Sequence, residues 1–153
     1  MGVRYMKFIH NKPHLIENKC ETIYYTDGVK IAKELKMTCL MPKYKNAIGL
    51  AHNQVGGNKR VFVAKINGVW KSFINPTITA KSKETYSTVE GCMTFPNKPN
   101  KVDRHTWVEV EHQINARNSN NGDMFITERF EGYEATIIQH ECDHLNGIHI
   151  HNK

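Results

Sequence analysis

The segment QHECDH at residues 139–144 constrains the fold more than any other part of the chain. On an α-helix, His140 and His144 lie one turn apart on the same face, where two imidazoles can bind one metal ion. Glu141 beside them can exchange protons with a metal-bound water. Cys142 points about 200° away from His140, so it is expected in the core. The motif predicts an interior helix with one face on a metal site, although short matches of this kind also arise by chance.

A third ligand is expected from another segment, because catalytic zinc sites usually have three protein ligands and an open position. Only nine residues follow His144, and His149 among them lies in a segment, IHIH, that alternates like a strand. Cys92, in VEGCMTFP, is the better candidate, since a thiolate with two imidazoles suits Zn²⁺ or Fe²⁺. Gly91 before it permits close approach of the backbone. The alternative for Cys92 is a small buried side chain without a ligand role.

Two segments have helical periodicity, residues 26–42 and residues 133–146. Thr26 or Asp27 can cap the start of the first helix, and Pro42 ends it. The second helix contains the metal motif, and Gly147 is placed to end it. The sequence therefore predicts one helix in the N-terminal part of the chain and one near its end.

Alternating apolar and polar residues predict strands between these helices. One pair of strands is joined by the turn signal Asn67-Gly68, and a second pair forms a hairpin across residues 115–123. Residues 43–59 and 87–96 lack such alternation and are expected to be loops. The pattern predicts an α+β fold, with mainly antiparallel β-sheets around a central metal-binding helix, plus an N-terminal helix, in a single domain of residues 1–153. The expected strands are residues 60–66, 69–80, 106–114 and 124–130, with Pro76 marking an edge or a bend.

Composition narrows the class of protein. The chain has a formal net charge of +6, but its lysines are scattered, so no specific nucleic-acid motif is indicated. It contains no apolar run of about 18 residues and no secretory signal at its start, so we expect a cytoplasmic protein without a membrane segment. Four cysteines in a reducing compartment favour metal ligation or burial over disulfides.

Three separated stretches resemble the motifs of peptide deformylases. Residues 47–54 (AIGLAHNQ) resemble the family's GxGLAAxQ, residues 90–94 (EGCMT) resemble EGCLS, and residues 140–144 (HECDH) resemble HExDH. They occur in the family's order, and the resemblance covers roughly residues 22 to 150. The chain is similar to short forms, virus-encoded or minimal, that lack the C-terminal helix of many bacterial members.

The resemblance implies a role for each matching residue. Glu141 is implied as the general base and then as the acid for the departing amine. The side chain of Gln54 and the backbone N–H of Met93 are implied as donors to the developing oxyanion. Arg104 and Asp143 are expected to form a structural ion pair. Cys92, His140 and His144 are implied as metal ligands, and Ile48, Gly49, Gly91, Tyr133 and Ile137 as contacts of the substrate.

The implied reaction is hydrolysis of the N-formyl group of N-formylmethionyl peptides, which releases formate. It requires one divalent metal ion, with Fe²⁺ as the native ion and Zn²⁺ or Ni²⁺ as substitutes. The expected location is the bacterial cytoplasm, or the host cytoplasm if the protein is virus-encoded, and a transient ribosome contact is left open. Two alternatives remain: a metallopeptidase that uses the H-E-x-x-H helix, and a non-catalytic metal-binding or RNA-binding module.

The chain also departs from the family's motifs. Ala47 stands in place of the first glycine, and Met93 and Thr94 stand in place of Leu and Ser. His52 stands in place of an alanine, either facing the mouth of the site or exposed. Pro99 stands where many bacterial members have an arginine that contacts the substrate backbone. These positions are where substrate recognition is expected to differ.

Overall fold

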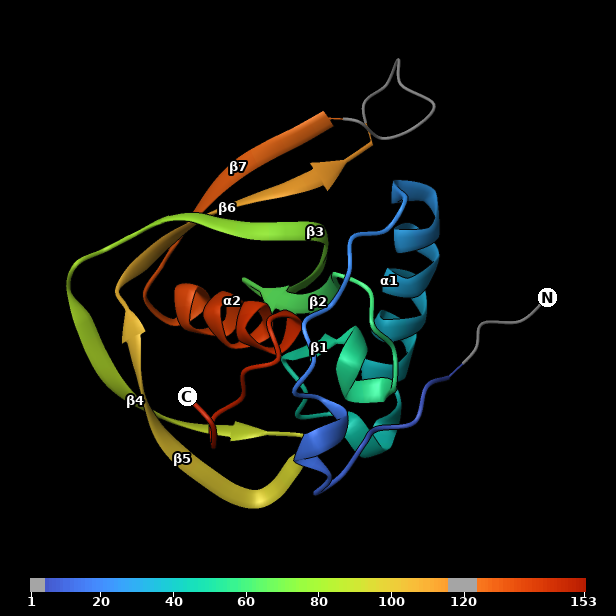
Figure 1. The fold of residues 1–153 in the computed structure, drawn as a ribbon, viewed down its shortest axis with the longest axis horizontal. Coiled ribbons are helices and arrows are strands. Elements are labelled where there is room, and N and C mark those ends of the chain that lie inside the picture. Colours follow the sequence, from blue (N-terminus) through green and yellow to red (C-terminus); the bar gives the residue numbers. More distant parts are fainter. Residues whose placement is uncertain (1–4, 116–123) are drawn as a thin grey trace.

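The computed structural model describes residues 5–115 and 124–153, in which a central helix lies between two antiparallel sheets (Figure 1). The helix is α2 (Gly132–Leu145), and it is the one that carries the histidine motif. The larger sheet has five strands in the order β1-β2-β3-β6-β7, and the smaller one pairs β4 with β5. The strands are β1 (Gly49–Ala51), β2 (Val61–Ile66), β3 (Val69–Lys81), β4 (Thr85–Cys92), β5 (Phe95–His105), β6 (Trp107–Ile114) and β7 (Met124–Glu131).

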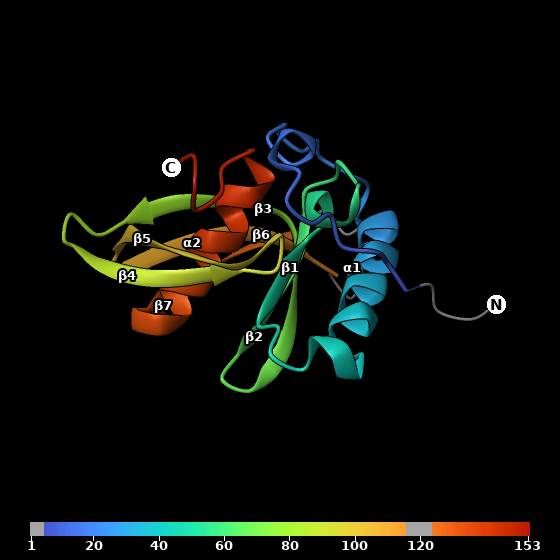
Figure 2. The same cartoon turned by 90° about the horizontal axis from the view of Figure 1, so that it is seen from below.

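The second helix, α1 (Tyr25–Cys39), covers the other side of the larger sheet, as Figure 2 shows. Strand β2 explains this arrangement, because its side chains alternate between two apolar layers. Phe62 and Ala64 pack in the cluster around α2, whereas Val61 and Val63 pack in the cluster with Leu35 of α1. Burial of each such large apolar side chain stabilises the fold by about 1.5–3 kcal/mol. The sheet thus holds α2 on one face and α1 on the other.

Most predicted elements are present near their expected bounds, and the α+β class is confirmed. The bend expected at Pro76 is present as a break in the pairing register between Ile74 and Thr77. Helix α2 ends at Leu145, and Gly147 has the left-handed φ of 76° that suits a helix end. A Cβ at Gly147 would also lie 2.5 Å from the backbone oxygen of Glu17. The turn between β6 and β7 falls largely outside the described residues.

Several local predictions were wrong. Residues 87–96, expected as a loop, lie largely in β4 and β5, where polar Glu90 is buried and apolar Val89 is exposed, so hydropathy does not reveal the strand. Residues 43–59 are not all loop, because they contain β1 and two short 3-10 helices, η2 (Pro42–Tyr44) and η3 (His52–Val55). Helix α1 begins at Tyr25 without a side-chain cap, so neither Thr26 nor Asp27 caps it. Residues 148–151 contain no strand, and residues 150–151 lie in a turn.

A buried polar cluster lies in the larger sheet, remote from the histidine motif. His112 of β6 is 2% exposed, and its Nε2 lies 2.8 Å from Oε2 of Glu128. Glu128 also pairs with Lys71. Burial lowers the pKa of His112, and the neighbouring carboxylate only partly opposes this. The imidazole is therefore neutral in the folded protein at pH 7.

Candidate active site

Three side chains bring a sulfur and two nitrogens to one point between β4 and α2. Sγ of Cys92 lies 3.4 Å from Nε2 of His144, which lies 3.2 Å from Nε2 of His140. The three ligand atoms all lie within 4.8 Å of one another. A thiolate with two imidazoles fits a tetrahedral Zn²⁺ or Fe²⁺ site with one open position. The donor set can therefore hold one divalent metal ion.

Three other residues that the sequence raised as candidates for the site are not part of this donor group. Cys142 is buried in the core cluster around α2, and burial raises the pKa of its thiol. His149 binds the carboxylate of Glu17 at 2.9 Å and is not part of the donor group. His52 is half-buried, and its Nδ1 accepts a hydrogen bond from the backbone N–H of Lys59. His52 does not line the cavity beside the donor group, so it is neither at the mouth of the site nor exposed.

Glu90 connects the donor group to a buried arginine, a role that the sequence reasoning did not assign. Oε1 of Glu90 lies 2.9 Å from Nδ1 of His140, which leaves Nε2 of that imidazole facing the donor group. Both oxygens of Glu90 accept hydrogen bonds from Arg104, at 2.8 and 2.7 Å. Burial opposes ionisation of Glu90, but the bonds from Arg104, His140 and Thr88 outweigh it and hold its pKa well below the usual range. Glu90 is therefore an anion that orients His140.

Arg104 of β5 completes this network from inside the protein. Its side chain is 1% exposed, and its Nη1 also binds Oδ2 of Asp143 at 2.5 Å. The ion pair between Arg104 and Asp143 that the family resemblance implied is thus present, but Glu90 is a second partner. One buried cation pairs with two carboxylates and joins the β4–β5 sheet to α2, while Asp143 is also bound by Lys153 at 3.1 Å.

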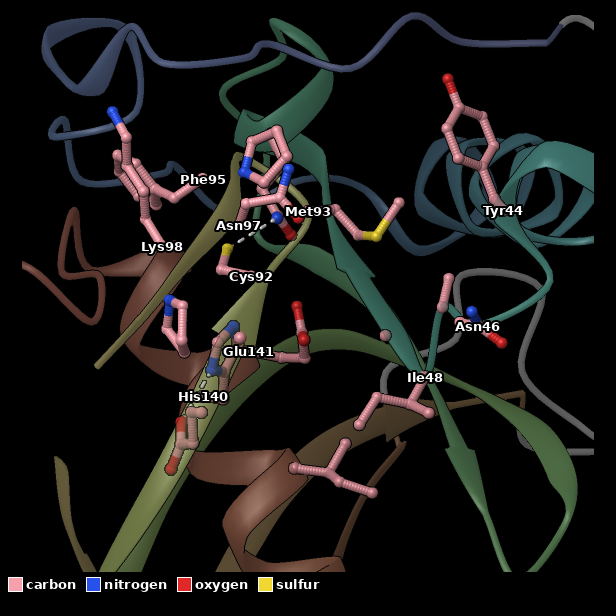
Figure 3. Close-up of a pocket in the computed structure, with 18 of the residues that line it drawn as sticks. Tyr44, Asn46, Ile48, Cys92, Met93, Phe95, Asn97, Lys98, His140 and Glu141 are labelled. Carbon is pink, nitrogen blue, oxygen red and sulfur yellow. Dashed lines mark hydrogen bonds and ion pairs between the residues drawn. The ribbon is translucent and has the colours of Figure 1, made fainter. Parts of the chain in front are cut away.

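Glu141 lies beside Cys92 and His140 on the wall of one cavity (Figure 3). Its side chain is 3% exposed, and its Oε1 has no hydrogen-bond partner among the described residues. Burial raises the pKa of Glu141 to about 7, although His140 and Arg104 oppose the shift. A carboxyl group with that pKa can both accept and return a proton near neutral pH.

Gly49 determines the space that is available to Glu141. A Cβ at this position would lie 2.5 Å from Oε2 of Glu141. Real Cβ atoms do not approach an oxygen so closely, so any side chain at residue 49 would displace the carboxylate. The glycine is required here by close approach of the strand, not by a special backbone angle.

Gln54 approaches the donor group from η3, which packs against α2. Its Oε1 accepts a hydrogen bond from the backbone N–H of Ala51 at 2.9 Å, which fixes the amide. Its Nε2 then donates to Oγ1 of Thr94 at 3.2 Å and lies 3.6 Å from Sγ of Cys92. Thr94 is fully buried, so it too contributes to the site, although the sequence identified it only as a departure from the motif. Gln54 is held with its N–H group directed toward the reaction centre.

A cavity of about 600 Å³ opens beside these groups (Figure 3). Met93 lines it next to Cys92, and Pro99 lies at its edge. The walls combine the buried Ile137 with the more exposed Ile48 and Tyr133. All five residues expected to contact the substrate line this one cavity: Ile48, Gly49, Gly91, Tyr133 and Ile137.

Comparison with known proteins decides the family. The chain matches the sequence model of the family described as polypeptide deformylase over residues 6–153. The chain belongs to this family. The peptide deformylase of Thermotoga neapolitana is 36% identical over 142 residues, which are 93% of this chain and 71% of that protein.

Solved deformylase structures share the fold. The crystal structure of peptide deformylase from Thermotoga maritima has a TM-score of 0.81 and 29% identity, and covers 98% of this chain and 97% of that one. The deformylase of the Vibrio parahaemolyticus bacteriophage VP16T, solved in complex with actinonin, has a TM-score of 0.79 and 31% identity. The match covers 95% of this chain and all of the phage chain.

Membership in the family gives the activity. The protein is a metal-dependent hydrolase that removes the N-formyl group from nascent polypeptides. Among residues 5–115 and 124–153, no helix is long and apolar enough to cross a membrane.

Proposed function

We propose that Cys92, His140 and His144 bind the catalytic metal ion of this deformylase. The observation that carries the proposal is the convergence of their three ligand atoms within 4.8 Å, beside the cavity. An ion held there would polarise the formyl carbonyl and lower the pKa of a coordinated water. Glu90 supports the arrangement by binding the other nitrogen of His140.

Glu141 acts as the general base and then as the general acid. Its carboxylate takes the proton from the attacking water and later donates it to the amine nitrogen as the C–N bond breaks. The buried Oε1 without a partner supports this role, because such an atom is available to a reacting group. Burial raises the pKa of Glu141 and so favours its protonated form, while a bound cation would favour the carboxylate, and these opposing effects suit a group that both takes and returns a proton.

Gln54 and Met93 stabilise the negative charge that develops on the formyl oxygen. The side-chain amide of Gln54 is fixed by Ala51 and Thr94 before the substrate arrives, so little reorganisation is needed. The backbone N–H of Met93, next to Cys92, is the second donor. The methionine side chain of the substrate then lies against Ile48, Tyr133 and Ile137, with the peptide backbone near Gly49 and Gly91.

The native ion in this proposal is Fe²⁺, with Zn²⁺ and Ni²⁺ as functional substitutes, since all three accept sulfur and nitrogen ligands. We further propose that residues 1–153 act as a single catalytic domain in the cytoplasm, with transient contact to the ribosome. The larger sheet supports a single domain, because β2 contributes side chains both to the cluster around α2 and to the cluster around α1.

The test is formate release from formyl-Met-Ala-Ser by protein loaded anaerobically with Fe²⁺, Ni²⁺ or Zn²⁺. Glu141→Gln should keep its metal and lose turnover, whereas Cys92→Ala should lose metal. Absence of formate with all three ions in fully loaded protein would refute the proposal. Cleavage of internal peptide bonds by the Cys92→Ala variant would instead support a metallopeptidase, and RNA affinity that survives metal removal would support a binding module.

A further inference from the structure

Two exposed lysines, Lys43 and Lys98, line the cavity. The carboxylates among its lining residues are Glu90 and Glu141, both of which are buried. We call Lys43 and Lys98 the cationic rim. Its charge is not balanced by any acidic side chain at the exposed part of the cavity wall.

The two lysines of the rim are available to a ligand. Neither forms an ion pair with any residue in the part of the chain that the structure describes. Nζ of Lys43 lies 4.9 Å from the ring centroid of Tyr44, a contact that leaves its charge unneutralised. In the described part of the chain, ion pairs of lysine are confined to Lys59, Lys71 and Lys153, so what distinguishes Lys43 and Lys98 is their place on the cavity wall.

The rim lies away from the apolar part of the cavity. In Figure 3, Lys98 and Tyr44 lie on opposite sides of the cavity, and both are distant from Ile48. Lys43 contacts the Tyr44 ring, so cations flank the cavity from two elements, η2 and β5. A peptide whose first side chain lies against Ile48 must lead its following residues out past exposed wall residues. Unpaired cations there attract carboxylates and repel ammonium groups.

We propose that the cationic rim makes this deformylase select formylated peptides with Asp or Glu among the first residues after methionine. The inference rests on the proposed function, because it assumes that the formyl group lies at the donor group and the methionine in the apolar part. It adds a preference that the catalytic residues do not supply. Lys43 and Lys98 are the specificity-determining residues.

The size of the effect follows from the exposure of the rim. An exposed ion pair changes a binding constant by about 1.5-fold to fivefold. A glutamate substrate gains attraction and a lysine substrate meets repulsion, so their kcat/KM values should differ by about threefold to tenfold at low salt. The difference should appear mainly in KM. The ratio of the two kcat/KM values should approach one as added salt shortens the Debye length from about 30 Å to about 8 Å.

The experiment compares three amidated peptides, formyl-Met-Ala-Glu, formyl-Met-Ala-Gln and formyl-Met-Ala-Lys, with the metal-loaded enzyme. Amidation removes the terminal carboxylate, which would otherwise bind the same lysines. A second series places the variable residue directly after methionine. In at least one series, kcat/KM should be highest for the glutamate peptide, intermediate for the glutamine peptide and lowest for the lysine peptide. The ratio of the glutamate to the lysine value should decline as salt is added.

Two variants locate the effect. Lys98→Glu and Lys43→Glu should each reduce or reverse the ratio of the glutamate to the lysine peptide. The matched control is Lys30→Glu, which makes the same charge change at an exposed position of α1 outside the cavity lining. The ratio is measured within each variant, so a general loss of activity does not affect it.

Each outcome is decisive. Equal kcat/KM for the glutamate and lysine peptides in both series would overturn the cationic rim as a selector. An equal response to Lys30→Glu would overturn the assignment to Lys43 and Lys98, because net charge alone would then explain the preference. Failure to release formate from the neutral glutamine peptide would overturn the proposed function itself.

Discussion

Replacing Glu90 with glutamine should weaken both the fold and the metal site. Glutamine keeps the shape of the side chain, but one oxygen becomes an NH₂ group, and this group must face a donor of Arg104 because each oxygen of Glu90 binds that arginine. At least one charge-assisted hydrogen bond is lost, and such bonds contribute about 1.5–3 kcal/mol each. Because Arg104 is buried and keeps only Asp143, we expect a loss of about 3 kcal/mol in the free energy of unfolding.

The melting temperature measures this loss in the free energy of unfolding. For a chain of this size, each kcal/mol shifts the midpoint by about 2–4 °C, so Glu90→Gln should melt about 6–12 °C lower. The metal affinity should fall about 10-fold to 100-fold, because His140 loses the anionic partner that orients it and keeps at most a neutral amide oxygen. Differential scanning calorimetry gives the first quantity, and competition with a chelator gives the second.

Asp143→Asn is the matched control for this prediction. Asp143 binds the same arginine but does not contact His140 in the structure. The variant should lose stability while its metal affinity stays within about threefold, since outer partners act through the ligand that they touch. If Glu90→Gln weakens metal binding no more than Asp143→Asn does, the orienting role of Glu90 is wrong.

Three further predictions concern other parts of the molecule. Gly49→Ala should retain metal, measured by elemental analysis, but lose at least tenfold in kcat, because the new Cβ displaces the Glu141 carboxylate; unchanged kcat would contradict the steric argument. Cys142→Ala should keep a full complement of metal in the same assay in which Cys92→Ala loses it, and equal losses would contradict the assignment of Cys142 to the core. His112 has a lowered pKa in the folded protein, so its contribution to stability is present above the unfolded pKa of about 6.5 and is lost as the pH falls below it. Urea titrations between about pH 7 and 5 should show a slope in unfolding free energy up to about 1.4 kcal/mol per pH unit steeper than in His112→Phe, and parallel slopes would refute the neutral imidazole.

The sequence was most informative where a single periodicity dominates. The histidine motif predicted the helix α2, and the helical angle between His140 and Cys142 predicted that the cysteine lies in the core. Strand β2 could also be recognised from residues 60–66. Alternation did not show that its two faces pack against different helices, because both faces are apolar.

The sequence was least informative in the segment around Cys92. Burial alternates along β4, but its inward positions include the polar Thr88 and Glu90 while the apolar Val89 is exposed, so the sequence shows no matching alternation of hydropathy. Interpreting the segment as a loop also concealed Glu90. In a strand, Glu90 and Cys92 are two residues apart, a spacing at which both side chains can face α2. The partners of Glu90 are 14 and 50 residues away, at Arg104 and His140, and local sequence carries no signal for such contacts.

The placement of the donor group on β4 and α2 has a consequence for when the protein can acquire its metal. The segments β5, β6 and β7 all lie between Cys92 and His140 in the chain, so the loop that joins the two halves of the site includes a large part of both sheets. Contacts of such long range form late, because closing the loop costs entropy before any contact compensates for it. We therefore expect metal capture to follow assembly of the sheets during synthesis, and not to guide it. Before α2 has been synthesised, the chain contains only Cys92 of the three proposed metal ligands.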